Sequence, residues 1–216
     1  MIELEQVGPI WVMRMGSGEN RFNETFIGEL NDSLDRVEGS GLPTALVTTG
    51  AGKFYSNGLD LEWLGTAPDA AAFLDEVHRV LVRVLLFPAV TVAAVNGHAF
   101  AAGAMLATAH DFMVMRSDRG YWCLPEVDLG LPLTPVMHGV VSARLPHSTL
   151  HEAITTGRRY DAEAAVAARI AHAGAPEAEV LSEAIALATE LSGKNPDVVA
   201  THKQLMYGAV ARLLGP

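Results

Sequence analysis

The chain has 216 residues, of which 50% are hydrophobic, and its 15 Lys+Arg against 25 Asp+Glu give a formal net charge of −10. This composition excludes a disordered chain, and the length suits one domain with a sizeable core. The acidic balance argues against binding to DNA or RNA, and the one cysteine of the sequence, Cys123, excludes an internal disulfide and a Cys-rich zinc site and indicates a reducing, intracellular setting.

The predicted elements begin with a strand over 10–15. Apolar residues at helical spacing then predict a helix over 22–38. The short apolar run 45–49 predicts a strand that is buried on both faces. A long amphipathic helix over 70–87 follows and ends at Pro88, because proline cannot continue a helix.

The middle of the chain contains a run, 84–109, without any Asp, Glu, Lys or Arg. It is long enough to span a bilayer. Pro88 and Gly97 interrupt it, however, and small alanines stand where a lipid-facing helix carries larger apolar residues. We therefore expect no membrane span but a buried strand over 90–95, a turn, and a buried helix over 101–108.

A third buried strand is expected over 112–115, and after Pro132 the chain is expected to be mainly helical. Strands that alternate with helices predict an α/β layered domain. We expect a core domain over 1–195 and a short helical segment over 196–216 that serves packing or assembly. The sequence shows no signal peptide and no peroxisomal tripeptide, so the expected location is cytoplasmic.

Three loops hold the residues on which chemistry could depend. The first, 53–61, and the second, 95–106, both follow a buried strand and place glycine and small residues where the chain turns. Backbone N–H groups in such turns are unpaired and can hold an anion or oxyanion. For either loop alone, glycines that only make a tight turn are the alternative. Two such loops together with an isolated carboxylate favour a catalytic site.

The third loop, 121–132, contains that carboxylate, Glu126, among Leu, Pro, Val and Trp residues. A carboxyl group in apolar surroundings has a raised pKa and suits general acid–base catalysis. A surface or structural glutamate is the alternative. Asp128 competes for the same role, because both side chains share one face if the segment is extended. The spacing does not choose between them.

Segments 53–61, 92–107 and 124–132 resemble the three signature blocks of the crotonase (enoyl-CoA hydratase/isomerase) superfamily, in the same order, and 156–165 resembles a fourth block. The resemblance implies an α/β fold of the ClpP/crotonase type, a spiral of ββα units with a helical C-terminal appendage. It also implies an acyl-CoA thioester substrate, as in fatty acid β-oxidation, with coenzyme A arriving as part of the substrate and no metal or other cofactor. The expected assembly is a homotrimer or dimer of trimers, without nucleic acid or membrane partners.

The resemblance also implies roles for individual residues. Family members hold the thioester oxygen with two backbone N–H groups, which here would be those of Leu59 and Ala102, and these stabilise the enolate formed when C2 loses a proton. Glu126 would be the catalytic base. Lys53, and outside the signature blocks Lys203, are candidates to approach the CoA phosphates; for each, an exposed solubilising charge is the alternative. The full set of expected substrate-binding residues is Lys53, Ser56, Asn57, Gly58, Leu61, Gly103, Met105 and Leu129.

Met105 departs from the hydratases of the family, which typically have a glutamate there and a second one at the position of Glu126. Hydration needs both carboxylates, whereas one base can move a proton from C2 to C4 of a 3-enoyl-CoA. We therefore expect a Δ3-Δ2-enoyl-CoA isomerase, closest to the plant type, which segment 110–121 also resembles. The alternatives are an enoyl-CoA hydratase or other CoA-thioester lyase, and a catalytically silent acyl-CoA-binding subunit.

Ser56 and His98 suggest one further alternative, a hydrolase. A serine nucleophile needs a histidine within hydrogen-bond reach, and the sequence contains no GxSxG elbow that would support such a pair. His98 is otherwise expected to be a core histidine, and His110 is expected to be structural.

Overall fold

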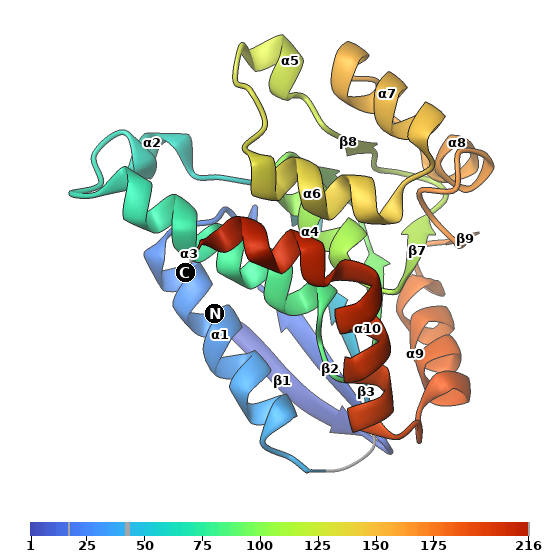
Figure 1. The fold of residues 1–216 in the computed structure, drawn as a ribbon. Coiled ribbons are helices and arrows are strands. Elements are labelled where there is room, and N and C mark those ends of the chain that lie inside the picture. Colours follow the sequence, from blue (N-terminus) through green and yellow to red (C-terminus); the bar gives the residue numbers. More distant parts are fainter. Residues whose placement is uncertain (17, 42–43, 216) are drawn as a thin grey trace.

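The computed structural model describes residues 1–16, 18–41 and 44–215, and two β-sheets organise them (Figure 1). In the larger sheet, β1 (Ile2–Val7) and β2 (Ile10–Met15) form an antiparallel hairpin. The sheet continues in parallel and in this order with β3 (Ala45–Thr49), β5 (Val90–Val95), β7 (Phe112–Arg116) and β9 (Ala173–Ala175). The smaller, parallel sheet consists of β4 (Phe54–Ser56), β6 (His98–Phe100) and β8 (Trp122–Cys123).

Helices cover both faces of the larger sheet. On one face lies α9 (Val180–Leu191). The core on the other face is built with α1 (Glu24–Glu38), α3 (Ala70–Leu85), α4 (Ala102–Ala109), α6 (Pro135–Arg144) and α10 (Pro196–Ala211). The shorter helices are α2 (Leu61–Leu64), α5 (Glu126–Leu129), α7 (His147–Thr156) and α8 (Ala162–Ala167), and a 3-10 turn follows at Arg212–Leu214.

Strand alternation explains why both faces are covered. Side chains in a strand point to opposite faces in turn. In β2, Ile10 and Val12 belong to the cluster under α9, whereas Met13 and Met15 belong to the cluster on the other face. All four are fully buried. In β3 all five residues are buried, so this strand is covered on both faces, as the sequence predicts for 45–49.

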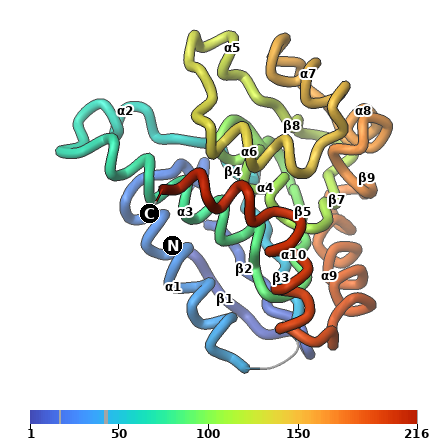
Figure 2. The backbone as a smooth tube through the Cα atoms, in the orientation of Figure 1, coloured from blue at the N-terminus to red at the C-terminus, as the bar shows by residue number. Residues whose placement is uncertain are grey.

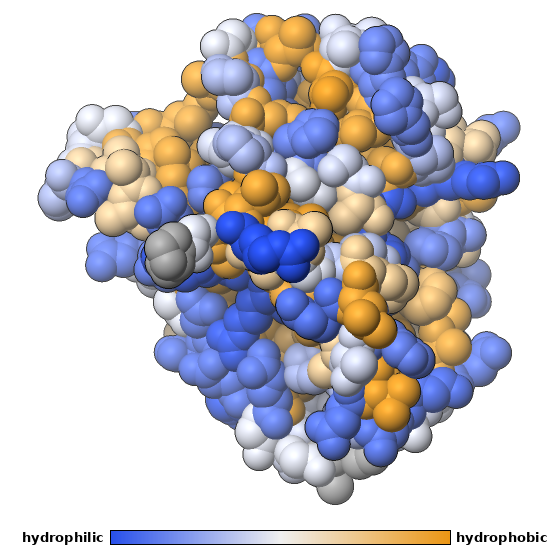
Figure 3. Space-filling view, in the orientation of Figure 1, coloured by the Kyte–Doolittle hydropathy of each residue, from blue (hydrophilic) through white to orange (hydrophobic). Residues whose placement is uncertain are grey.

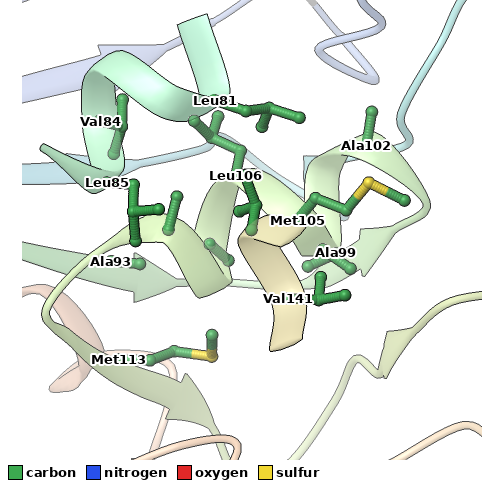
Figure 4. Close-up of a cluster of buried hydrophobic side chains, with 14 of the residues drawn as sticks. Leu81, Val84, Leu85, Ala93, Ala99, Ala102, Met105, Leu106, Met113 and Val141 are labelled. Atoms are coloured by element: carbon green, nitrogen blue, oxygen red, sulfur yellow. The ribbon is translucent and has the colours of Figure 1, made fainter. Parts of the chain in front are cut away.

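The uncharged run 84–109 folds as predicted. It forms the end of α3, the strand β5, a turn, β6 and then α4, all of whose residues are buried. Figure 4 shows α4 packed against α3, with Leu81, Leu85 and Leu106 at the contact. Among the described residues, no helix is both long and apolar enough to cross a membrane.

The predicted strands and long helices are confirmed, with shifted ends. The helix expected over 22–38 begins at Glu24, because the Asn23 side chain caps it by accepting from the Phe26 amide. The helix expected over 70–87 ends at Leu85. Segment 126–129 is a turn of helix, so the condition under which Glu126 and Asp128 would share a strand face is not met.

A buried ion pair connects α10 to the sheet. The amine of Lys203, which is 4% exposed, donates to the Ala89 carbonyl at 2.9 Å and to the Asp111 carboxylate at 2.6 Å. Burial lowers the pKa of Lys203. Figure 2 traces α10 across the front of the molecule, where it packs against α3 and α6. Lys203 is therefore part of the core, and the expectation that it approaches a CoA phosphate is wrong.

Candidate active site

A cavity of about 460 Å³ lies between α2, α3, α5 and α6, beside the start of α4. Its lining is mainly apolar and includes leucines from several elements: Leu61, Leu64, Leu74, Leu129 and Leu131. The polar or charged side chains among the described lining residues are Arg21, Asn57, Glu126 and Thr134. A mainly apolar cavity with a few polar groups is the usual form of a small-molecule site.

One wall of this cavity forms where the chain leaves β4 and β6. The Phe22 amide donates to the Gly58 carbonyl at 2.8 Å, which fixes the first loop. Gly58 has φ +79, and a Cβ on it would lie 2.9 Å from the Ala101 Cβ and 3.1 Å from the Ala102 amide nitrogen. The two loops therefore touch at Gly58. Leu59, the next residue, and Ala102 both line the cavity. We call this part of the cavity lining, together with Gly58, the amide wall: residues 57–59, 101 and 102.

Ala101 adopts a backbone conformation that L-residues rarely occupy, with φ 51 and ψ −126. Such a conformation costs about 1–3 kcal/mol and persists where surrounding contacts impose it. Here the Ala101 amide donates to the Cys123 carbonyl at 3.1 Å, and the Ala101 carbonyl accepts from Met105 at 3.0 Å. The next amide, that of Ala102, is the first of α4 and has no acceptor within the helix. The strained turn thus comes directly before an N–H without an intrahelical partner, in a residue that lines the cavity.

Ser56 and Gly103 lie behind the amide wall. The Ser56 side chain is fully buried; its hydroxyl donates to the Asn20 carbonyl at 2.7 Å and accepts from the Gly58 amide at 3.2 Å. A Cβ on Gly103 would lie 2.4 Å from the Ser56 carbonyl oxygen, so no side chain fits there. These two residues support the wall from behind and are not among those that line the cavity.

The opposite wall carries Glu126, the first residue of α5. We call residues 124–134, which leave β8 and lead into α6, the base arm. One carboxylate oxygen of Glu126, Oε2, is buried and has no hydrogen-bond partner within the described residues. Burial raises the pKa of Glu126. A carboxyl group with a raised pKa and a free oxygen at a cavity is suited to take up a proton from a bound molecule.

Asp128, the competing carboxylate, does not line the cavity. Two residues along a helix turn the side-chain direction by about 200°. Asp128 is exposed, and its carboxylate lies against Gly157 at the end of α7. The structure therefore separates two carboxylates between which the sequence alone does not choose, and places Glu126 at the cavity.

Of the remaining expected site residues, Asn57, Leu61, Met105 and Leu129 line the cavity. Lys53 does not: its amine lies 5.1 Å from the centre of the Phe54 ring on β4. No group of three or more His, Cys, Asp and Glu side chains that could hold a metal ion occurs in the described part of the chain.

The suggested Ser56–His98 pair does not form. The His98 ring lies among aromatic rings, 5.0 Å from that of Phe100 and 5.5 Å from that of Phe54, whereas the Ser56 hydroxyl bonds to backbone groups. His110 is buried, with Nε2 2.9 Å from the Thr48 hydroxyl, and burial lowers its pKa to about 4. It is neutral near pH 7 and has a structural role.

Two polar lining residues were not anticipated from the sequence. Arg21 donates through Nε to the Glu19 carboxylate at 2.7 Å. The Thr134 hydroxyl caps α6 and lies 2.9 Å from Nε2 of the buried His78. The Thr-Pro pair at 134–135 is a recognisable helix start, but only the packing of α3 against α6 shows that it borders a cavity.

Known proteins resemble this chain over nearly its whole length. A family model described as enoyl-CoA hydratase/isomerase matches residues 6–214. Enoyl-CoA delta isomerase 3 of Arabidopsis thaliana is 32% identical over 228 residues, covering 99% of this chain and 95% of the relative. The peroxisomal enoyl-CoA delta isomerase 2 of the same plant is also 32% identical, covering 100% and 95%. The crystal structure of a probable enoyl-CoA hydratase from Mycobacterium tuberculosis matches with a TM-score of 0.92 at 26% identity, covering 99% of this chain and 91% of that one.

Proposed function

The chain belongs to the enoyl-CoA hydratase/isomerase family, and we propose that it is an enoyl-CoA isomerase, which shifts a double bond of an acyl-CoA thioester from the 3- to the 2-position. Its fold is the crotonase-like α/β fold that the sequence predicts. The names of its relatives support the isomerase assignment, since two plant proteins that match it end to end are called isomerases. The M. tuberculosis neighbour is called a probable enoyl-CoA hydratase in one structure and an enoyl-CoA isomerase in another, so the residues of the site have to decide.

The observation that carries the proposal is the single carboxylate of the cavity. Among the described residues that line it, Glu126 alone bears a carboxyl group, and Met105 fills the place where a hydratase of this family has its second one. Met105 is 1% exposed and belongs to the core. A thioether cannot deprotonate water. One acid–base group suffices, however, for a reaction that removes and returns the same proton.

In the proposed reaction, the Glu126 carboxylate takes a proton from C2 of a 3-enoyl-CoA. The electrons of that C–H bond form a dienolate, whose oxygen is held by the amides of Leu59 and Ala102. Glu126 then returns the proton to C4, and the double bond moves from C3–C4 to C2–C3. Proton and electrons balance without a redox or metal cofactor. Each oxyanion donor of this kind is worth about 2.7–4 kcal/mol in the transition state.

We propose that the acyl chain lies along the leucines of the cavity and the CoA moiety along its polar side. Leu61, Met105 and Leu129 would contact the acyl chain, and Asn57 would lie next to the thioester. Lys53, on the surface at β4, would approach a CoA phosphate. Gly58, Ser56 and Gly103 would act indirectly, through the amide wall.

Assembly into a homotrimer or dimer of trimers is also proposed. Support comes from α10, where Leu205 is 79% and Met206 60% exposed. Exposed apolar groups that adjoin one another commonly mark an interface. Analytical ultracentrifugation of the chain and of Leu205→Glu tests this: the variant should sediment as a smaller species, and a monomeric wild type would refute the proposal.

The central experiment incubates the purified protein with a 3-enoyl-CoA and, separately, with a 2-enoyl-CoA. We expect conversion of the first and no net hydration of the second, and loss of conversion in Glu126→Gln. Glu183→Gln, an exposed glutamate on α9, is the matched control and should retain full activity. Hydration of the 2-enoyl-CoA would instead identify a hydratase. Binding of both compounds without turnover would identify a silent acyl-CoA-binding subunit.

A further inference from the structure

We propose that Gly157, at the end of α7, is a positioning residue for Glu126, because it contacts the chain on both sides of that residue. The role of Glu126 as base rests on the proposed function, whereas the geometry does not. Gly157 is about thirty residues from Glu126 in sequence and is not among the residues that line the cavity. In Figure 1, α5 and α7 stand beside each other at the top of the molecule.

The first contact precedes Glu126 by three residues. The thiol of Cys123 donates to the Gly157 carbonyl, with Sγ 3.2 Å from the oxygen. Cys123 is buried, and burial raises the pKa of its thiol to about 11. The thiol therefore keeps its proton at neutral pH and remains a donor. This bond ties the start of the base arm to the end of α7.

The second contact follows Glu126 by two residues. A Cβ on Gly157 would lie 2.5 Å from Oδ2 of Asp128 and 3.1 Å from its Cγ. The Asp128 carboxylate thus occupies the space in which any other side chain would begin. Gly157 also has φ +60, which favours glycine by itself. The backbone conformation favours glycine here, and a Cβ at this position would have to displace the Asp128 carboxylate, which belongs to the base arm.

Between Leu124, which is 1% exposed, and Thr134, which caps α6, the base arm has few other supports. Its helix α5 is a single turn, and its residues Val127 and Leu129 are 47% and 53% exposed. Among the described elements, α7 is the one against which α5 mainly packs. Figure 3 shows apolar surface at the top of the molecule, in the region of this arm. A shift at Gly157 is therefore expected to move Glu126, and a displacement of 1 Å in a catalytic group can lower a rate about a hundredfold.

The end of α7 is itself held firmly. The Gly157 amide donates to the Ala153 carbonyl at 3.1 Å. The Glu152 carboxylate accepts from Arg158 at 2.8 Å and from the Tyr160 hydroxyl at 2.6 Å. These bonds hold the residues around Gly157 in place, so that its contacts can fix the position of the base arm.

The test uses Gly157→Ala with Gly8→Ala as its control. Gly8 has the same φ of +60 at the β1–β2 turn, but a Cβ there would meet nothing within 4 Å. Gly157→Ala is expected to lower kcat for 3-enoyl-CoA by about tenfold to a hundredfold, with KM changed less than about threefold. Gly8→Ala, which introduces the same backbone strain far from the site, should leave both constants within about twofold.

A double substitution separates the clash with Asp128 from backbone strain. Asp128→Ala removes the carboxylate that a Cβ on Gly157 would strike. If the two residues act through one contact, adding Gly157→Ala to Asp128→Ala lowers kcat by less than about threefold further. If instead the two losses multiply, the proposed contact does not position Glu126, and the inference is wrong.

A second measurement does not depend on turnover. The pKa of the Glu126 carboxyl is followed by carbon-13 NMR, with Glu126→Gln used to assign its signal. Displacement toward water should lower this pKa toward 4.5 in Gly157→Ala and leave it unchanged in Gly8→Ala. The charged or titratable groups near the arm are Asp128 on α5, Arg21 and His138 at the adjoining cavities, and Arg159 beside Cys123.

The two proposals fail in different ways. A wild-type protein that does not convert 3-enoyl-CoA refutes the proposed function, while the NMR comparison still decides the positioning role. An unchanged Glu126 pKa in Gly157→Ala overturns the positioning role, even in an active isomerase.

Discussion

The two walls of the cavity hold their functional groups by different means. In the amide wall, backbone touches backbone at Gly58, the fully buried Ser56 supports it from behind, and Ala102 is 2% exposed. In the base arm, Val127, Leu129 and Leu131 are exposed, and the arm depends on contacts with α7. The amide wall is therefore part of the core, whereas the middle of the base arm lies on the surface of the core.

This difference follows from what each wall has to supply. Hydrogen-bond donors that stabilise an oxyanion are effective because they are fixed before the reaction and need no reorganisation. Backbone amides at the end of buried strands meet that need as a result of folding itself. A catalytic base, in contrast, needs a side chain that is shielded from water, so that its pKa is raised, and that can reach both C2 and C4 of the substrate. The short helix α5 places such a side chain at the cavity without any change to the core.

The largest expected effect is at the base arm, where a substitution should lower activity without lowering stability. Glu126→Gln should lower kcat by about a thousandfold, because general acid–base catalysis contributes about 10²–10⁴-fold. The midpoint of thermal unfolding should not fall, since the substitution removes a buried charge and keeps the shape of the side chain. Activity assays and calorimetry on the same sample check this. A large drop in the midpoint would show that the arm belongs to the core after all.

At the amide wall, activity and stability should be lost together. A Cβ in Gly58→Ala would lie 2.9 Å from the Phe100 carbonyl oxygen and 3.1 Å from the Ala102 nitrogen. We expect kcat to fall about a hundredfold and the free energy of unfolding to fall by about 3 kcal/mol. Gly193→Ala, at φ +75 with nothing within 4 Å, is the control, and it should cost about 1 kcal/mol without loss of activity.

The pH dependence of activity should follow the protonation of Glu126 on the base arm. Burial raises the pKa of Glu126 above 4.5, so kcat/KM should rise about tenfold per pH unit on the acid limb and level off above that raised pKa. The same shift makes the Glu126 contribution to stability greatest below its unfolded pKa, and this contribution is lost as pH rises through the folded pKa. Unfolding of wild type and Glu126→Gln at several pH values tests the sign. Wild type should lose stability relative to Glu126→Gln as pH rises, and a wild type that gains stability relative to the variant would contradict the sign.

The smallest effect concerns the strain in the amide wall. Ala101→Gly should raise the free energy of unfolding by about 1 kcal/mol, because glycine adopts the observed φ of 51 without a steric penalty. We expect kcat to stay within about twofold. Ala72→Gly, at an exposed position of α3, should have the opposite effect and lose about 1 kcal/mol. Chemical denaturation of both variants provides the comparison.

The sequence predicts the amide wall more completely than the base arm. Strands β3 and β5 contain only apolar residues and threonine, which identifies them as buried, and the loops that follow them contain recognisable motifs. The four-residue helix at 126–129 lies between Pro125 and Gly130 and has no helical period to detect. Whether it is extended or helical decides where Asp128 points, and this depends on its packing against α7.

The short strands and the cavity lining were beyond prediction for a related reason. β4, β6 and β8 are two or three residues long and exist because they pair with one another. Arg21 and Thr134 meet at a cavity although more than one hundred residues separate them in sequence. Patterns within a short stretch of sequence predict the structure of that stretch. Contacts between residues far apart in sequence form only when the whole core is assembled.

The buried ion pair of α10 has a consequence for synthesis of the chain. The acceptors of the Lys203 amine, Ala89 and Asp111, precede it by 114 and 92 residues. At typical ribosomal speeds these acceptors are made about 5–20 s before their donor. Until then, the Asp111 carboxylate lacks its cation, and closing the core around it would be costly. Nascent chains that stop short of Lys203 should therefore remain sensitive to proteases, because the sheet is stabilised by a helix that is synthesised long after its central strands.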